Sequence, residues 1–235
     1  MSALLGPAAV PAAVQRPPRV DLLHWTLAAL AAVLAWDLSG LDLVVLQWVS
    51  GPDGSFAWRD HVLTRRVLHD GGRLLGVLVL LLLAVNVWRP LVAGPGRAER
   101  VHWLLVTLLC MVAVPALKQI SRTSCPWDLA GHGGVASLVS HWDFTLGDGG
   151  PGRCFPSGHA TAAFGFFAGW FVLRRHRPGL ARVWLAGVLT AGALFGGAQV
   201  LRGAHHASHV LWTAWLCWAL SAALLAIAPR RQRSV

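Results

Sequence analysis

The chain has 235 residues, of which 55% are hydrophobic and only 13% are charged. A soluble domain carries about 25% charged residues, so this composition excludes an ordinary soluble domain and favours a membrane protein. The formal net charge of +10 would also fit a nucleic-acid-binding protein. However, the arginines cluster at the ends of apolar segments, as topogenic charges do, so we expect no nucleic-acid partner.

Apolar runs recur along the chain, and a membrane-spanning helix needs about 20 such residues. The first twenty residues are rich in proline and alanine and lack the compact apolar stretch of a signal peptide. Six spans are predicted, at 22–40, 73–90, 101–119, 159–174, 182–201 and 209–228. The predicted fold is therefore all-α, a six-transmembrane-helix bundle over 21–228, flanked by a cytoplasmic tail at 1–20 and a basic tail at 229–235.

Three loops are predicted at one end of this bundle. Asp37 and Asp42 interrupt the first span, and the apolar residues 41–49 that follow are too few to cross a bilayer alone. We therefore expect them to continue along the interface. The three loops are 41–72 with an interfacial helix, a polar glycine-rich loop at 120–158, and a short histidine-rich turn at 202–208.

Arginine placement predicts the orientation of the chain. Twelve basic residues lie on the side of the two tails and eight on the side of the three loops. Basic residues favour the cytoplasmic side, so both termini are expected in the cytoplasm, with the three loops on the periplasmic or extracytoplasmic face of an inner membrane.

The four cysteines fall into two groups. Cys110 and Cys217 lie within apolar runs and are expected to be small core residues. Cys125 and Cys154 lie in the polar loop, where a disulfide forms only if the loop faces an oxidising compartment. The sequence leaves both states open.

Three polar clusters are expected to meet at the loop end of the bundle. Lys118, the single lysine of the chain, ends span three; Pro156 to His159 opens span four; and His205 and His209 lie between spans five and six. Because consecutive spans run in opposite directions, all three clusters are predicted to lie on one face of the membrane.

The residue types in these clusters favour phosphate chemistry. Ser157 is predicted to cap a helix whose free N–H groups at Gly158 and His159 bind an anion. The side chains of Lys118, Arg122 and Arg202 can add positive charge around phosphoryl oxygens. Two histidines in different surroundings can act as a nucleophile and a general acid.

These clusters resemble the type 2 phosphatidic acid phosphatase superfamily, which includes vanadium haloperoxidases. Its pattern is Lys-x6-Arg-Pro, then Pro-Ser-Gly-His, then Ser-Arg-x5-His-x3-Asp. The middle motif is complete in this chain, and Lys118 and Pro126 match the first motif, although Cys125 replaces its arginine. In the third motif His205 takes the place of the nucleophile, while Ala198-Gln199 replaces Ser-Arg and His209 replaces the aspartate.

The resemblance, over about residues 70–225, implies a reaction and a role for each matching residue. His205 would attack phosphorus, His159 would protonate the leaving oxygen, and His209 would lie behind the nucleophile. Lys118, Ser157 and the Gly158 N–H would bind the phosphoryl group, with Arg122 and Arg202 as hypothetical substitutes for the two missing arginines. The carboxylate behind His205 is left open, and Asp128, Asp143 and Asp148 are candidates.

The implied activity is a metal-independent membrane lipid phosphatase that needs no cofactor and forms a phosphohistidine. Its substrate would be a lipid phosphomonoester or pyrophosphate in the bilayer, such as undecaprenyl pyrophosphate, phosphatidic acid, phosphatidylglycerol phosphate or lipid A. Transfer of phosphate between lipids is an alternative, and oligomeric state stays open. Two other classes are alternatives to a phosphatase: a metal-binding protein with a site on His159, His205 and His209, and a haem or transport protein.

Several residues also have simpler interpretations. Lys118 could merely extend its ammonium towards the membrane boundary, although its uniqueness favours function. His206 is expected at the surface, and Asp128, His132 and His141 are expected to decorate a solvated loop.

Overall fold

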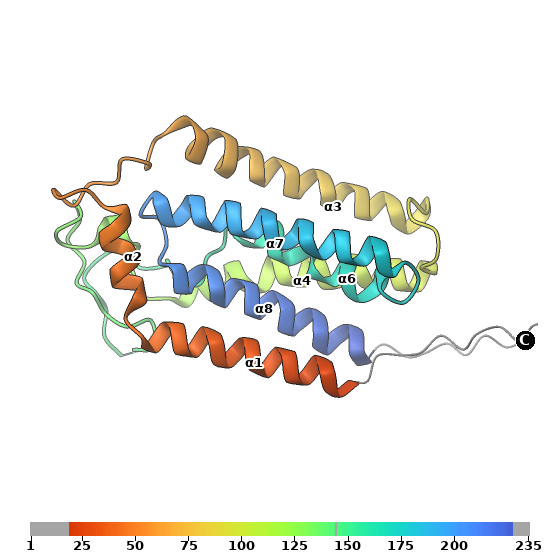
Figure 1. The fold of residues 1–235 in the computed structure, drawn as a ribbon. Coiled ribbons are helices and arrows are strands. Elements are labelled where there is room, and N and C mark those ends of the chain that lie inside the picture. The colour runs from red at the N-terminus through yellow and green to blue at the C-terminus, as the bar shows by residue number, and fades with distance from the viewer. Residues whose placement is uncertain (1–18, 144, 228–235) are drawn as a thin grey trace, which may run out of the picture.

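The computed structural model describes residues 19–143 and 145–227, and this part of the chain is helical without a β-strand. Both predicted tails, apart from Arg19 and Val20, lie outside the described residues. The long helices lie side by side in one bundle, with the connecting loops gathered at its two ends (Figure 1). We call the end that carries residues 121–160 and 202–206 the loop end.

Two helices form the first predicted span and its continuation. Helix α1 covers Arg19–Leu38 and α2 covers Leu41–Val49, and the two meet at an angle of 66°. Gly40 lies between them with φ 73°, a left-handed conformation that glycine adopts without steric cost. α1 runs along α8, whereas α2 turns across the loop end (Figure 1).

The next helices differ from the prediction at one point. The π-helical turn η1, Leu63–Gly71, continues directly into α3, Gly72–Trp88, so that Leu63–Trp88 forms one long helix. The helix expected to lie in the interface before span two is therefore part of the helix that enters the bundle. Helix α4 covers Arg97–Ile120 and is followed by the loop that contains the short helix η2, Pro126–Asp128.

The centre of the bundle is the short segment 161–173. It consists of α5 at Thr161–Phe164, η3 at Gly165–Phe167 and α6 at Ala168–Leu173. Helices α7, Pro178–Leu201, and α8, Ala207–Ile227, pack against it together with α3 and α4. Gly192 of α7 allows this approach, because a Cβ there would lie 2.1 Å from the Phe164 ring.

Length and composition support fewer spans than the sequence predicts. Four helices are long and apolar enough to cross a membrane, and the bent pair α1–α2 raises the number to five. The six-span prediction is not confirmed, because the segment 161–173 is too short by this criterion. Its side chains are almost all buried by neighbouring helices, so protein rather than lipid surrounds it. Several apolar helices of this length are compatible with a multi-pass helical membrane protein.

Candidate active site

Lys118 lies in the last turn of α4, at the loop end. A Cβ added to Gly158 would lie 3.5 Å from Cδ of Lys118, so the lysine side chain passes directly beside the second motif. No carboxylate among the described residues forms an ion pair with its ammonium group. The first and second motifs therefore meet, with an unpaired positive charge beside them.

The second motif forms a turn before the central helix. The helix begins at Thr161 with Ala160 as its N-cap, three residues after the predicted cap, so Ser157 is not its N-cap. Ser157 is fully buried, and its Oγ has no hydrogen-bond partner among the described residues. Within the same part of the chain, the N–H groups of Gly158 and His159 donate to no backbone carbonyl. The turn thus offers three polar donors without protein partners.

Helix α8 holds this turn in place. The Ser157 N–H donates to the carbonyl of His209 at 3.1 Å, and Thr213 Oγ1 donates to the carbonyl of Ser157 at 3.0 Å. The second and third motifs are therefore bound to each other through the backbone, and the predicted meeting of the three clusters is observed.

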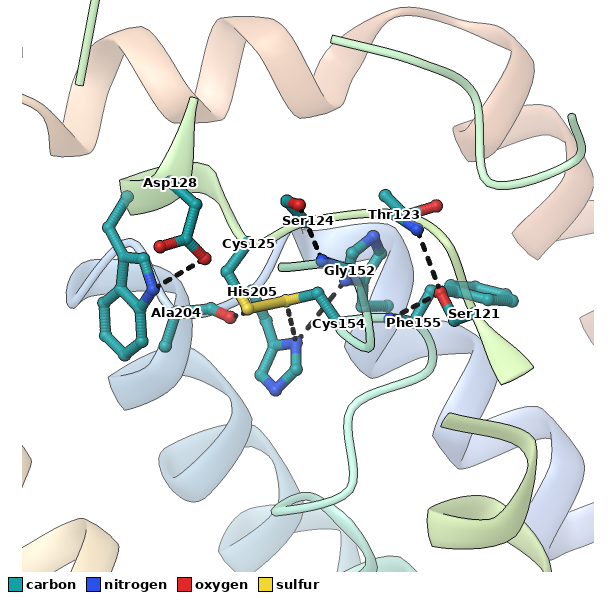
Figure 2. Close-up of a disulfide and its surroundings, with 12 residues drawn as sticks. Ser121, Thr123, Ser124, Cys125, Asp128, Gly152, Cys154, Phe155, Ala204 and His205 are labelled. Atoms are coloured by element: carbon teal, nitrogen blue, oxygen red, sulfur yellow. Dashed lines mark hydrogen bonds between the residues drawn. A yellow bond between two sulfur atoms is a disulfide. The ribbon is translucent and has the colours of Figure 1, made fainter. Parts of the chain in front are cut away.

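His205 lies in the turn between α7 and α8 and is only 5% exposed. Its Nδ1 is 3.4 Å from Nδ1 of His209 and 3.4 Å from Sγ of Cys154, as Figure 2 shows for the sulfur contact. Burial, and then the positive charges of Lys118 and His159, hold the pKa of His205 well below 6.5. The imidazole is therefore neutral at pH 7, the state in which a ring nitrogen can act as a nucleophile.

His159 packs against a residue that sequence reasoning missed. Its ring stacks on His69, with centroids 4.1 Å apart and planes at 12°, and His69 Nδ1 lies 2.9 Å from Asp70 Oδ1. Burial and then the charge of His69 lower the pKa of His159 to about 4. Nε2 of His159 is buried without a hydrogen-bond partner in the described chain, so it is free to meet a ligand.

A disulfide joins the two ends of the polar loop 120–158 from within it. Cys125 and Cys154 are bonded, with Cα atoms 5.1 Å apart (Figure 2). The bridge links the residue at the family's arginine position to the residue two before Pro156. Cys125, Cys154 and His205 are close enough to suit a metal ion, but the disulfide leaves neither sulfur as a thiolate ligand.

The two substitute arginines occupy different surroundings. Helix α4 ends at Ile120, so Arg122 does not lie on a further helical turn; its side chain is exposed and donates to the carbonyl of Thr145 at 3.1 Å. Arg202 is buried, donates to the carbonyl of Arg59 at 2.8 Å, and lies close enough to His159 to lower that pKa.

Gln199, at the position of the family's second arginine, is another residue that sequence reasoning missed. It is 3% exposed, and its Oε1 accepts from Arg202 Nη1 at 3.4 Å. Its Nε2 is buried without a partner among the described residues. A neutral donor therefore stands where the family has a guanidinium.

Among the described residues, no hydrogen bond joins Asp128, Asp143 or Asp148 to His205. Asp128 accepts from Trp127 Nε1, Asp143 accepts from its own turn, and Asp148 accepts from Ser124. Two predictions about histidines are wrong. His206 is buried rather than at the surface, and His141 is packed against Phe155 and hydrogen-bonded to Asp37 instead of lying in solvent.

The comparisons with known proteins agree with this assembly. A family model described as the PAP2 superfamily matches residues 100–233, which is more than half of the chain. The matched region contains all three motifs and begins after α1, α2 and α3. No curated protein and no solved structure matches the chain.

Proposed function

Since the chain belongs to the PAP2 superfamily, whose members are phosphatases and related phosphoesterases, we propose that it hydrolyses a lipid phosphate through a phosphohistidine on His205. The observation that supports this proposal most strongly is the common location of Lys118, the Ser157–His159 turn and His205 at one end of the bundle. Three separate helix ends thereby supply a cation, unpartnered donors and a neutral imidazole to one tetrahedral anion.

In the first step, Nε2 of His205 attacks phosphorus and forms a P–N bond. The bond from phosphorus to the lipid oxygen breaks, and its electron pair goes to that oxygen. His159 then gives its proton to the leaving oxygen. The two Nδ1 atoms are 3.4 Å apart, and with His209 as the acceptor the proton of His205 stays on Nδ1, which leaves Nε2 free to attack.

In the second step, water attacks the phosphohistidine. His159, now neutral, takes a proton from the water, the P–N bond breaks, and its electrons return to His205 Nε2. Inorganic phosphate leaves and both histidines regain their starting states. Because the pKa of His159 is about 4 in the free protein, the negative phosphate must raise it, so that His159 carries a proton when substrate is bound.

The transferred group is held by donors that lack other partners. Lys118 neutralises charge on the phosphoryl oxygens, and Ser157 Oγ and the N–H of Gly158 donate to them. Gln199 Nε2 and Arg202 are proposed to substitute for the arginines of the family pattern. Arg122 is the weaker candidate, because its guanidinium is exposed and donates to a loop carbonyl.

A lipid is the proposed substrate because the site lies at the end of a membrane helix bundle. We place the chain in the inner membrane with both termini in the cytoplasm, from its arginine distribution. A disulfide in the loop that covers the site supports an oxidising, extracytoplasmic location for it.

Phosphate release from a panel of purified lipid phosphomonoesters and pyrophosphates, with EDTA present, tests this function. The wild type is expected to act on at least one of them, and His205→Ala and His159→Ala are expected to abolish release. His61→Ala is the matched control, because this exposed histidine lies at the same end of the chain's bundle. Loss of activity with EDTA would favour the metal site, and full activity of His205→Ala would refute the proposal.

A further inference from the structure

A negative charge is missing behind the nucleophile. His205 becomes cationic when its Nε2 bonds to phosphorus, and its Nδ1 faces Nδ1 of His209 and the disulfide sulfur of Cys154, neither of which is an anion. A neutral imidazole can accept a hydrogen bond but contributes no negative charge. The loop carboxylates Asp128, Asp143 and Asp148 are engaged in local structure, so the compensating charge must come from elsewhere.

The break between α1 and α2 brings two carboxylates to this place. Asp37 lies at the end of α1 and Asp42 in the first turn of α2, where the chain bends across the loop end (Figure 1). The apolar composition of a membrane span does not explain either aspartate. Placing a carboxylate in apolar surroundings costs free energy, so an ionisable residue at such a position is a candidate for a functional role.

Asp37 is buried and holds His141. Its side chain is 6% exposed, and its Oδ2 lies 3.0 Å from Nε2 of His141, whose side chain is 9% exposed. The same oxygen accepts from Nε1 of Trp142 at 2.7 Å and from Nε1 of Trp212 at 3.3 Å. Among the described residues no lysine or arginine pairs with this carboxylate, so its charge is not cancelled by a permanent cation.

His141 connects this carboxylate to the histidine pair. Its ring stacks on Phe155 at 4.0 Å, and it meets the His209 ring edge-on with centroids 5.8 Å apart. Phe155 also packs edge-on against His209 at 5.3 Å. His141 and Phe155 thus both pack against the ring of His209, and Asp37 is hydrogen-bonded to His141.

Asp42 acts on the start of α8. Its Oδ1 accepts from the N–H of Ser208 at 2.9 Å and from Nε1 of Trp36 at 2.9 Å. Ser208 directly precedes His209, so this carboxylate fixes the first turn of the helix that carries it. Asp42 also opposes the effect of burial on the pKa of His206, the neighbour of the nucleophile.

We propose that Asp37, acting through His141, supplies the negative charge for the cationic His205–His209 pair, while Asp42 positions the helix that carries His209. Both are positioning residues from α1 and α2, outside the matched family region, and the inference rests on the proposed function. No proton is transferred to Asp37. The proton on Nδ1 stays between the two imidazoles, and the buried carboxylate stabilises the positive charge that they share. The titratable groups that act directly on this pair are Lys118, His159, His206 and His141, whereas Asp37 and Asp42 act on His141 behind it.

A double-mutant cycle with His209→Asp tests this inference. Asp37→Asn alone is expected to lower kcat about 100-fold with little change in KM, because the substrate does not touch Asp37. His209→Asp restores the carboxylate of the family pattern and is expected to remain active. In that background Asp37→Asn is expected to cost less than about 10-fold, because the charge is then supplied by residue 209.

Several outcomes would overturn the inference. Equal losses from Asp37→Asn in both backgrounds would mean that the two positions are not coupled. A folded but inactive His209→Asp would mean that a carboxylate at this position does not take over the role assigned to Asp37. If Asp37→Asn does not fold, the cycle is run with His141→Gln, and the same comparison decides. Asp53→Asn, which removes an exposed carboxylate from the same end, is the control and should keep wild-type kcat. Wild-type activity that depends on His205 is measured first, so failure of the proposed function is recognised separately.

Discussion

Breaking the disulfide between Cys125 and Cys154 should both destabilise the loop end and lower activity. The bridge joins residues separated by 29 positions, and loop-closure entropy for that length corresponds to about 3.6 kcal/mol. The bridge also fixes Cys154, whose sulfur lies 3.4 Å from Nδ1 of His205. Cys154 lies just before the turn that offers the phosphate donors. A shift of this turn by about 1 Å costs about 100-fold in rate.

The assay compares thermal unfolding and phosphate release in detergent, with and without a thiol reductant. The double variant Cys125→Ser/Cys154→Ser should unfold at a lower temperature and lose kcat, and reductant should have no further effect on it. Cys110→Ser is the matched control, because Cys110 is a buried free thiol away from the loop. Unchanged unfolding temperature and unchanged kcat in the double variant would refute the reasoning.

Other predictions concern charge and protonation. Lys118→Met should lower kcat/KM about 100-fold. It should also move the acid limb of the pH–rate profile to higher pH, because removing this cation raises the pKa of His205; a limb at the same pH would contradict this. His159→Gln should lower kcat about 100-fold or more for alkyl phosphates but less for aryl phosphates, whose leaving group needs no proton; equal losses would exclude the acid role. Because the pKa of His159 is about 4 in the folded protein against 6.5 in the unfolded chain, the unfolded state binds the extra proton between these values. The thermal stability of the wild type should therefore fall as pH is lowered from 6.5 to 4, and the stability of the His159→Gln variant should fall less steeply. Parallel curves of unfolding temperature against pH would contradict the assignment.

The sequence predicted the fold class and the meeting of the motifs, because apolar run lengths and alternating span direction determine which helix ends share a face. It predicted the number of spans less well. Residues 159–174 are apolar enough to resemble a span, but apolarity does not distinguish a lipid-facing helix from one enclosed by other helices.

The surroundings of the site could not be predicted, because they depend on contacts between distant segments. His141 lies 104 positions from Asp37, and no local pattern indicates that one will bind the other. Ser157 matched a helix N-cap in sequence, yet the chain makes a turn there before the helix begins at Thr161. The interruption of the first span by Asp37 and Asp42 is the sequence signal for these carboxylates, and by itself it predicts only a break in a span.

The most direct test of the central claim is to identify the residue that carries phosphate during turnover. The protein is mixed with a lipid substrate labelled on phosphorus, quenched in alkaline denaturant, which preserves phosphohistidine, and digested for mass spectrometry. The label is expected on the peptide that contains His205, with His205→Ala giving none. Label on His159 or on another residue, or turnover with no labelled histidine at any time, would contradict the account.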